Sequence, residues 1–245
     1  MCTCFMETLS RRLRAALLAA AVTVLVCGAV PVAAGEVEWK MLIDQANLHL
    51  QRGSLQQAEL FAREAIAEAG RSFGPGHRAL DQSLATLGLV LRFAQRYPEA
   101  EKELRRALEL REKSLGPRDP ATAILVNNLA DVVQAQKKYA EAEQLYRRVL
   151  VVFEKSYGDD PKTAAALNNL GATLHAQGRH AAAEPVLRRA LAMKEKTLGP
   201  NNPSVAHTLN NLAQVVAAQG RQAEADRLTA RAAAIHRGGK RASGA

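Results

Sequence analysis

Pairs of adjacent asparagines recur at one fixed place in a repeated pattern, at Asn127–Asn128, Asn168–Asn169 and Asn210–Asn211. The first members of successive pairs are 41 and 42 residues apart. An asparagine amide offers two donors and an acceptor without carrying charge. A file of such amides can therefore bond the main chain of a peptide whatever its side chains are, which is the chemistry of binding and not of catalysis.

The sequence around these pairs is repeated as well. The stretch ATAILVNNLADVVQAQKKYAEAEQLYRRVLVVFEKSYG from Ala121 returns as TAAALNNLGATLHAQGRHAAAEPVLRRALAMKEKTLG from Thr163. Each copy carries two runs of apolar residues at helical spacing, which predict a helical hairpin. Gly- and Pro-containing segments such as LGPRDP and LGPNNP separate the copies and predict turns, since Gly ends one helix and Pro opens the next. A fixed period of this size indicates stacked units, none of which buries its apolar face alone.

The first 34 residues differ in kind from the repeats. Arg11, Arg12 and Arg14 precede an uncharged run from Ala15 to Ala34, which ends in small residues. This pattern predicts a secretory signal peptide over residues 1–34, cleaved after Ala34. An uncleaved membrane anchor is the alternative, because about twenty uncharged residues can just span a bilayer.

Cleavage at this point would change the composition of the working chain. All three cysteines, Cys2, Cys4 and Cys27, lie in the leader, so the mature chain would hold no disulfide, thiolate nucleophile or cysteine metal site. The leader takes away three arginines and one glutamate, and the formal net charge falls from +9 to +7. We expect an exported protein, periplasmic or secreted, or one anchored in the inner membrane if the leader is kept.

Small residues at fixed places in each unit make the chain resemble the tetratricopeptide repeat. Gly88, Ala130, Gly171 and Ala213 match the first such place, and Ala100, Ala142, Ala183 and Ala225 match the second. The phrases LNNLA and AEPVLRRAL and the LGPNNP linker resemble the 42-residue variant found in kinesin light chains and in many bacterial proteins. The resemblance implies an all-α, right-handed superhelical solenoid of about five antiparallel helix pairs. Its units lie near residues 36–74, 77–116, 119–158, 160–199 and 202–236, and a flexible basic tail follows over 237–245.

The same resemblance implies that the first helices line a concave groove that binds a peptide or a partner segment. The residues carried over to the groove are Arg92, Asn127, Asn128, Asp131, Asn168, Asn169, His175, His207, Asn210, Asn211 and Gln214. We hypothesise that Asn128, Asn169 and Asn211 bond the ligand main chain, while the other three asparagines lie nearer the interface between repeats. The alternative is that the asparagines only satisfy neighbouring groups between repeats.

Other functional classes find less support in the sequence. The groove has Arg92 but lacks the lysines with which some relatives grip a C-terminal carboxylate. His175 and His180 are five residues apart, so we expect two solvated histidines and no metal site. Glutamates at the starts of second helices suit the helix dipole and not acid–base catalysis. Paired arginines on those helices alternate with glutamates, which favours a solvated face over a nucleic-acid surface.

The sequence therefore predicts a non-catalytic protein-interaction scaffold that needs no cofactor, metal or small-molecule substrate. Its partner is expected to be a protein or peptide, and a membrane only if the N-terminal segment is uncleaved. A membrane-tethered envelope assembly factor, held by an uncleaved N-terminal helix, is the second hypothesis.

Overall fold

A computed structural model describes residues 31–242, which form ten helices and no strand. The chain divides into two compact units, residues 1–90 and 91–245, with the boundary inside one helix. The helices are α2 (Pro31–Gln51), α3 (Leu55–Phe73), α4 (Arg78–Phe93), α5 (Tyr97–Leu115), α6 (Pro120–Ala135), α7 (Tyr139–Tyr157), α8 (Pro161–Ala176), α9 (His180–Leu198), α10 (Pro203–Ala218) and α11 (Gln222–Ala242).

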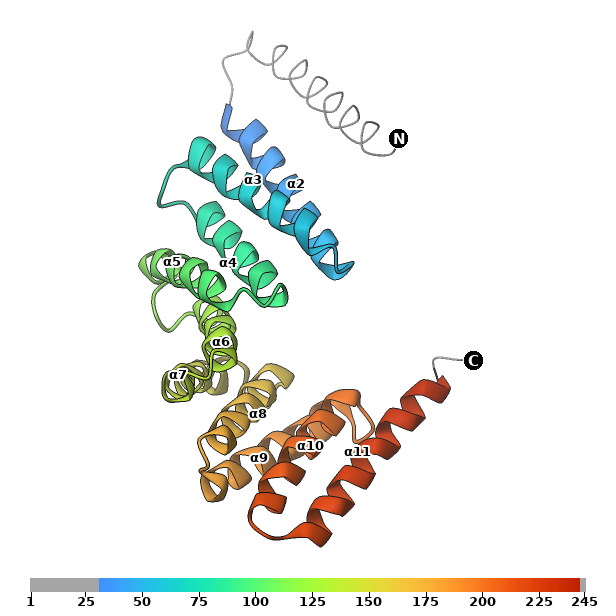
Figure 1. Cartoon of the computed structure of the whole chain (residues 1–245). Coiled ribbons are helices and arrows are strands. Elements are labelled where there is room, and N and C mark those ends of the chain that lie inside the picture. Colours follow the sequence, from blue (N-terminus) through green and yellow to red (C-terminus); the bar gives the residue numbers. More distant parts are fainter. Residues whose placement is uncertain (1–30, 243–245) are drawn as a thin grey trace. The chain divides into compact units, whose positions relative to one another are not determined.

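Consecutive helices pack as hairpins (Figure 1). In the first unit α2 packs against α3. In the second unit α6 packs against α7, α8 against α9 and α10 against α11, and each second helix also contacts the first helix of the next hairpin. The first helices α6, α8 and α10 touch in sequence. This order confirms the all-α stack of helix pairs that the repeats predict.

Each predicted turn has a glycine or polar cap that ends or opens a helix. Gly116 follows α5 with φ of +87°, a left-handed conformation that glycine adopts without steric cost. Asp119 then precedes Pro120 and accepts a hydrogen bond from the backbone N–H of Ala121 at 2.7 Å. Asp160 and Asn202 cap α8 and α10 in the same way. The side-chain cap satisfies an N–H group that the helix itself leaves unbonded.

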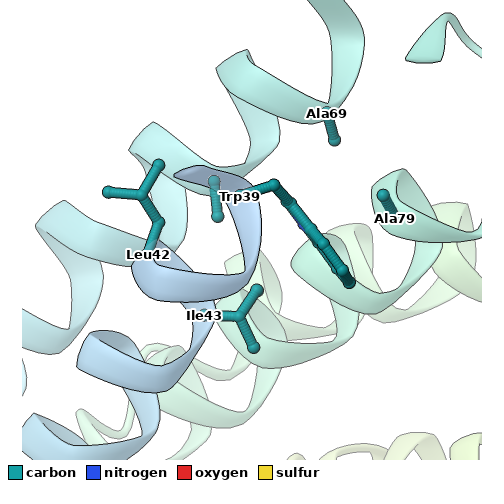
Figure 2. Packing of buried hydrophobic residues seen from close by; sticks show 6 residues of the cluster. Trp39, Leu42, Ile43, Ala69 and Ala79 are labelled. Carbon is teal, nitrogen blue, oxygen red and sulfur yellow. The ribbon is translucent and has the colours of Figure 1, made fainter. Parts of the chain in front are cut away.

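The core of the first unit is built around Trp39 of α2 (Figure 2). Leu42, Ile43, Ala69 and Ala79 belong to the same buried cluster, and the ring points from α2 toward Ala79. The indole Nε1–H donates to Ser83 Oγ at 2.8 Å, so the polar group of this buried aromatic is satisfied. The fold of this unit therefore fixes α2 against α3 and the start of α4.

In the second unit, small residues allow the paired helices to pack closely. Ala142 and Ala183 are fully buried at the starts of α7 and α9. Gly171 of α8 faces Leu187 of α9, where an added Cβ would lie 2.5 Å from the Leu187 Cγ atom. These positions are the ones that carry the family resemblance, and the structure shows the packing reason for them.

Most of the predicted signal peptide lies outside the described residues, although Pro31–Ala34 form the first turn of α2. Within residues 31–242, no helix combines the length and apolarity needed to cross a bilayer. The sequence predicts a flexible basic tail over 237–245, whereas α11 continues to Ala242 in the structure. Buried Ala232 and Ile235 hold this helix to the last repeat, and the helix extends beyond them.

Candidate functional site

Two asparagines from successive repeats bond directly to each other. Asn211 of α10 donates from Nδ2 to Asn168 Oδ1 of α8 at 3.0 Å. The Asn168 amide nitrogen lies 3.3 Å from the Oδ1 atom of its neighbour Asn169 and 3.5 Å from His207 Nδ1. Asn168 is buried, with only 2% of its surface exposed. The amides therefore form a chain of contacts that joins α8 to α10.

Asp131 of α6 continues this chain. Its Oδ1 atom accepts from Asn169 Nδ2 at 3.1 Å and from the Tyr146 hydroxyl at 2.7 Å, and its Oδ2 atom lies 3.2 Å from Arg92 Nη1. Burial raises the pKa of Asp131, although the bonds from Tyr146 and Asn169 and the charge of Arg92 act in the opposite direction. Burial and the neighbouring carboxylate also raise the pKa of Tyr146. The phenol therefore stays protonated and donates a hydrogen bond to Asp131.

These polar side chains line an open hollow of about 380 Å³ on the second unit, which we call the amide hollow. Its lining is Arg92, Asp131, Gln134, Asn168, Asn169, Ala172, His207 and Asn211. Burial and the charge of Lys194 lower the pKa of His207, so this imidazole is held toward its neutral form at the rim. The hollow thus presents mainly uncharged donors and acceptors together with one compensated ion pair.

The structure does not bring all the predicted groove residues together. Six of them line the amide hollow: Arg92, Asp131, Asn168, Asn169, His207 and Asn211. Asn127 instead lines a second hollow of about 200 Å³, whose wall includes the apolar side chains of Ile124 and Phe153. Asn128 and Asn210 are half-buried, Gln214 is exposed, and none of the three lines either hollow.

His175 and His180 correct one expectation. They are not two separately solvated histidines, because their Nδ1 atoms lie 3.0 Å apart. Gly178, with φ of +76°, reverses the chain between α8 and α9 and brings the rings together. In this contact one of the two nitrogens carries a hydrogen and the other accepts the hydrogen bond. Burial and the nearby His180 lower the pKa of His175. Among the described residues, no cluster of three His, Cys, Asp or Glu side chains could hold a metal ion.

A second polar system, which the sequence analysis missed, joins one repeat to the next. In each case the acceptor is a glutamate near the start of α5, α7 or α9. One donor is the basic residue just before the second helix of the next repeat. For Glu101 and Glu143, the glutamine just after the first helix of that repeat is another donor. The bonds are Lys138 to Glu101 at 2.7 Å, Gln136 to Glu101 at 2.6 Å, Arg179 to Glu143 at 2.8 Å, Gln177 to Glu143 at 2.9 Å and Arg221 to Glu184 at 2.8 Å. The signal was readable, since Gln136, Gln177 and Gln219 recur at the repeat period.

The arginines of the second helices are bound within the same surface. Ion pairs join Arg105 to Glu101, Arg147 to Glu143 and Arg188 to Glu184, one helical turn apart on each helix. Arg148 and Arg189 reach back to Glu112 and Glu154 of the preceding repeat. The arginines and glutamates that alternate along these helices are therefore paired with one another, both within a helix and between repeats.

Comparison with known proteins identifies the architecture. A family model described as the tetratricopeptide repeat matches residues 40–113, 80–155, 121–196 and 163–237. The structure is similar to the nearly identical TPR-like repeats of a putative kinesin light chain from Podosopora anserina, with 23% identity, a TM-score of 0.69, and coverage of 80% of this chain and 94% of that one. BtubC (BKLC) from P. vanneervenii is 22% identical with a TM-score of 0.75, over 91% of this chain and 88% of that one.

A third similar structure is the Rap conjugation gene regulator of plasmid pLS20 in complex with the Phr* peptide. It is 12% identical with a TM-score of 0.64, over 88% of this chain and 58% of that one. No curated protein sequence is significantly similar to this chain. At such identities the structural likenesses show the fold alone, whereas the family model covers the chain from residue 40 to residue 237. The chain belongs to the tetratricopeptide repeat family.

Proposed function

We propose that this protein is a non-catalytic interaction scaffold that binds an extended peptide segment of a partner protein in the amide hollow. The observation that carries the proposal is the lining of that hollow, in which amides from three successive first helices, α6, α8 and α10, lie beside Arg92 and His207. Main-chain groups of an extended peptide offer one donor and one acceptor at almost every residue. Uncharged amides match that demand without selecting a particular side chain.

The amides of the hollow keep hydrogen-bonding capacity beyond their contacts with one another. Each amide nitrogen has two hydrogens. Asn169 uses one toward Asp131, and Asn211 uses one toward Asn168. The network therefore orients the side chains and leaves donors for a ligand, so inter-repeat bonding and ligand binding are compatible roles.

The electrostatics of the hollow favour a main-chain ligand over a strongly charged one. The charge of Arg92 is compensated by Asp131 at 3.2 Å, and His207 is held toward its neutral form. The pLS20 Rap regulator, a protein of similar fold, has been solved with a bound Phr* peptide. That structure supports the idea that such helix stacks can hold a peptide.

The same geometry supports a non-catalytic role. Tyr146 and Asp131 are the closest pair of titratable side chains in the network, at 2.7 Å. Burial and the Asp131 charge raise the pKa of the phenol, which makes the tyrosine a poor nucleophile and a poor base. The carboxylate is occupied by Tyr146, Asn169 and Arg92. The pair orients neighbouring side chains and does not provide an activated group.

The test is a binding experiment with two matched double variants. The first, Asn169→Ala with Asn211→Ala, removes two amides that line the amide hollow. The second, Asn210→Ala with Gln214→Ala, removes two amides from α10 that line neither hollow. Partners are captured from envelope extract by the wild-type protein, and overlapping synthetic peptides that cover their sequences are tested for binding. The dissociation constant of the peptide that binds most tightly is then measured with all three proteins.

We expect the first variant to bind the peptide at least about tenfold more weakly, a loss of about 1.4 kcal/mol in binding free energy, and the second to bind like the wild type. Far-UV circular dichroism and thermal unfolding must show that both variants are folded at the assay temperature. Equal affinities for all three proteins would place the binding surface elsewhere and overturn the proposal.

We also propose that the protein is exported by the leader at residues 1–34 and works in the periplasm or outside the cell. The basic residues, apolar run and small-residue end of this segment support the proposal. An assembly factor tethered by the uncleaved segment is the competing arrangement. The intact mass of the protein purified from a Gram-negative host separates the two, because cleavage after Ala34 excludes the tether.

A further inference from the structure

Gly35 lies in α2 with its backbone against α3. The residue is buried, and a methyl group built on it would lie 2.3 Å from Ser72 Oγ and 3.4 Å from Glu68 Oε1. A separation of 2.3 Å between a carbon and an oxygen atom is far inside van der Waals distance. Only glycine fits at this position without displacement of α3.

Glu68, the acidic neighbour of Gly35, is itself buried. The residue is only 5% exposed, and its oxygens accept bonds from the Ser72 hydroxyl and from Arg71. The Arg71 side chain is 71% exposed, so the positive charge lies mostly in water while the carboxylate does not. A buried carboxylate is costly unless charge and hydrogen bonds compensate for it. It has about four lone-pair sites, so it can accept a further donor.

The sequence places the predicted leader cleavage immediately before this same glycine. As the structure has it, α2 begins at Pro31 and has no acidic residue in its first turn. A helix that begins at Gly35 would instead have Glu36 and Glu38 in its first turn, as α5 has Glu99 and α7 has Glu141. Acidic residues are favourable there because they compensate the positive end of the helix dipole. The segment from Gly35 onward thus carries the charge pattern of a helix start.

We propose that cleavage after Ala34 makes Gly35 the N-terminal residue and that its ammonium group pairs with the buried Glu68 carboxylate. Hydrolysis of the Ala34–Gly35 peptide bond by a leader peptidase consumes one water molecule. It leaves a carboxyl group on Ala34 and an amino group on Gly35, which takes up a proton at neutral pH. The proposal rests on the export proposed above and goes beyond it, because it makes the cut end a packed part of the fold.

The geometry brings the new charge close to the Glu68 carboxylate. The nitrogen and a Cβ atom are bonded to the same Cα, so they are only about 2.5 Å apart. The amino group of Gly35 therefore lies within about 6 Å of Glu68 Oε1, a range in which an opposite charge stabilises the charged form of a group. An ammonium at a helix start is otherwise unfavourable, because it meets the positive end of the dipole. Glu68 offsets this cost.

The order of events follows from burial. Gly35 is helical and packed against Ser72 in the folded chain, so a peptidase could not reach the bond before it. Cleavage must precede folding, as it does when a chain is cut during translocation. The folded protein then gains a charge pair that the uncut chain lacks.

The first experiment establishes the N-terminus. The full chain with its leader is expressed in a Gram-negative host, and the exported protein is characterised by intact mass and N-terminal sequencing. We expect loss of residues 1–34 and a sequence that begins Gly-Glu-Val-Glu. Any other first residue, or an uncut chain, overturns both the cleavage site and the pairing inferred from it.

The second experiment tests the pairing on the processed protein. The amino group of Gly35 is acylated at pH 7, and the rate is followed by mass spectrometry of the peptide that begins at Gly35. Only the unprotonated amine reacts, so pairing that raises the amine pKa by about one unit slows the reaction about tenfold. We expect Glu68→Gln to abolish this protection. Glu59→Gln is the control on the same helix, because Glu59 pairs with Arg63 on the exposed side.

Two outcomes decide the inference. Equal rates in the wild type and in a folded Glu68→Gln protein overturn the pairing and leave the export proposal intact. If Glu68→Gln does not fold, an alanine inserted between Ala34 and Gly35 serves instead, since it moves the amine about 3.8 Å along the chain. Fast acylation of the inserted residue supports the pairing, and a rate equal to that of the wild type overturns it.

Discussion

At Gly171 the side chain of Leu187 occupies the space that any Cβ would need. An added Cβ would lie 2.5 Å from Leu187 Cγ, and Leu187 is fully buried. We expect Gly171→Ala to lower the free energy of unfolding by about 1–2 kcal/mol, because overpacking outweighs the helix propensity gained. In a Leu187→Ala background the same change should become stabilising by up to about 1 kcal/mol. Urea unfolding of the four proteins measures both signs, and a destabilisation that persists in the double variant would contradict the packing explanation.

Glu101 is a residue at which acid should weaken a contact between repeats. Burial raises the pKa of this carboxylate, but hydrogen bonds from Lys138, Arg105 and Gln136 lower it to about 2, from an ordinary value of 4.5. The folded state therefore binds the proton less readily than the unfolded state does. The stability that Glu101 contributes is complete above about pH 4.5 and is lost as the pH falls toward about 2. We expect Glu101→Gln to flatten this part of the stability–pH curve, whereas Glu109→Gln, with an exposed partner in Lys113, should change it less.

Among the turns that join helices, the one between α6 and α7 is strained where its counterparts in the next two repeats are not. Lys137 adopts a φ of +62°, and the equivalent positions in those repeats are Gly178 and Gly220. A left-handed conformation costs a residue with a Cβ roughly 1–2 kcal/mol. We expect Lys137→Gly to raise the free energy of unfolding by up to about 1 kcal/mol, since greater freedom of glycine in the unfolded chain offsets part of the relief. Thermal unfolding checks this, and Lys137→Ala is the control that removes the charge without relieving strain.

The elements were predictable where the determinants are local and repeated. The caps at Asp119 and Asp160, the small residues at Ala142 and Gly171 and the helical periods are all visible in the sequence. The contacts across repeats were harder to predict, because they depend on the offset between stacked hairpins. Asn168 meets Asn211, and the turn at Gly178 brings His175 to His180, only once that offset and the hairpin angle are fixed. The continuation of α11 to Ala242 was missed because a helix held by Ile235 can extend past its last buried contact.

At the scale of the whole molecule, a stack of this kind couples only neighbouring repeats, so its stability should vary along the chain. In the second unit α10 and α11 enclose a cluster that includes Val205, Leu209 and Ile235. Truncation by Ile235→Ala leaves a cavity and should cost about 2–4 kcal/mol in this terminal hairpin. We expect hydrogen exchange followed by mass spectrometry to show faster exchange throughout α10 and α11, a smaller change in α8 and α9, and none in α6 and α7. Uniform acceleration across the second unit would mean that the repeats unfold as one cooperative body, and the amide hollow between α6, α8 and α10 would then share the stability of its weakest repeat.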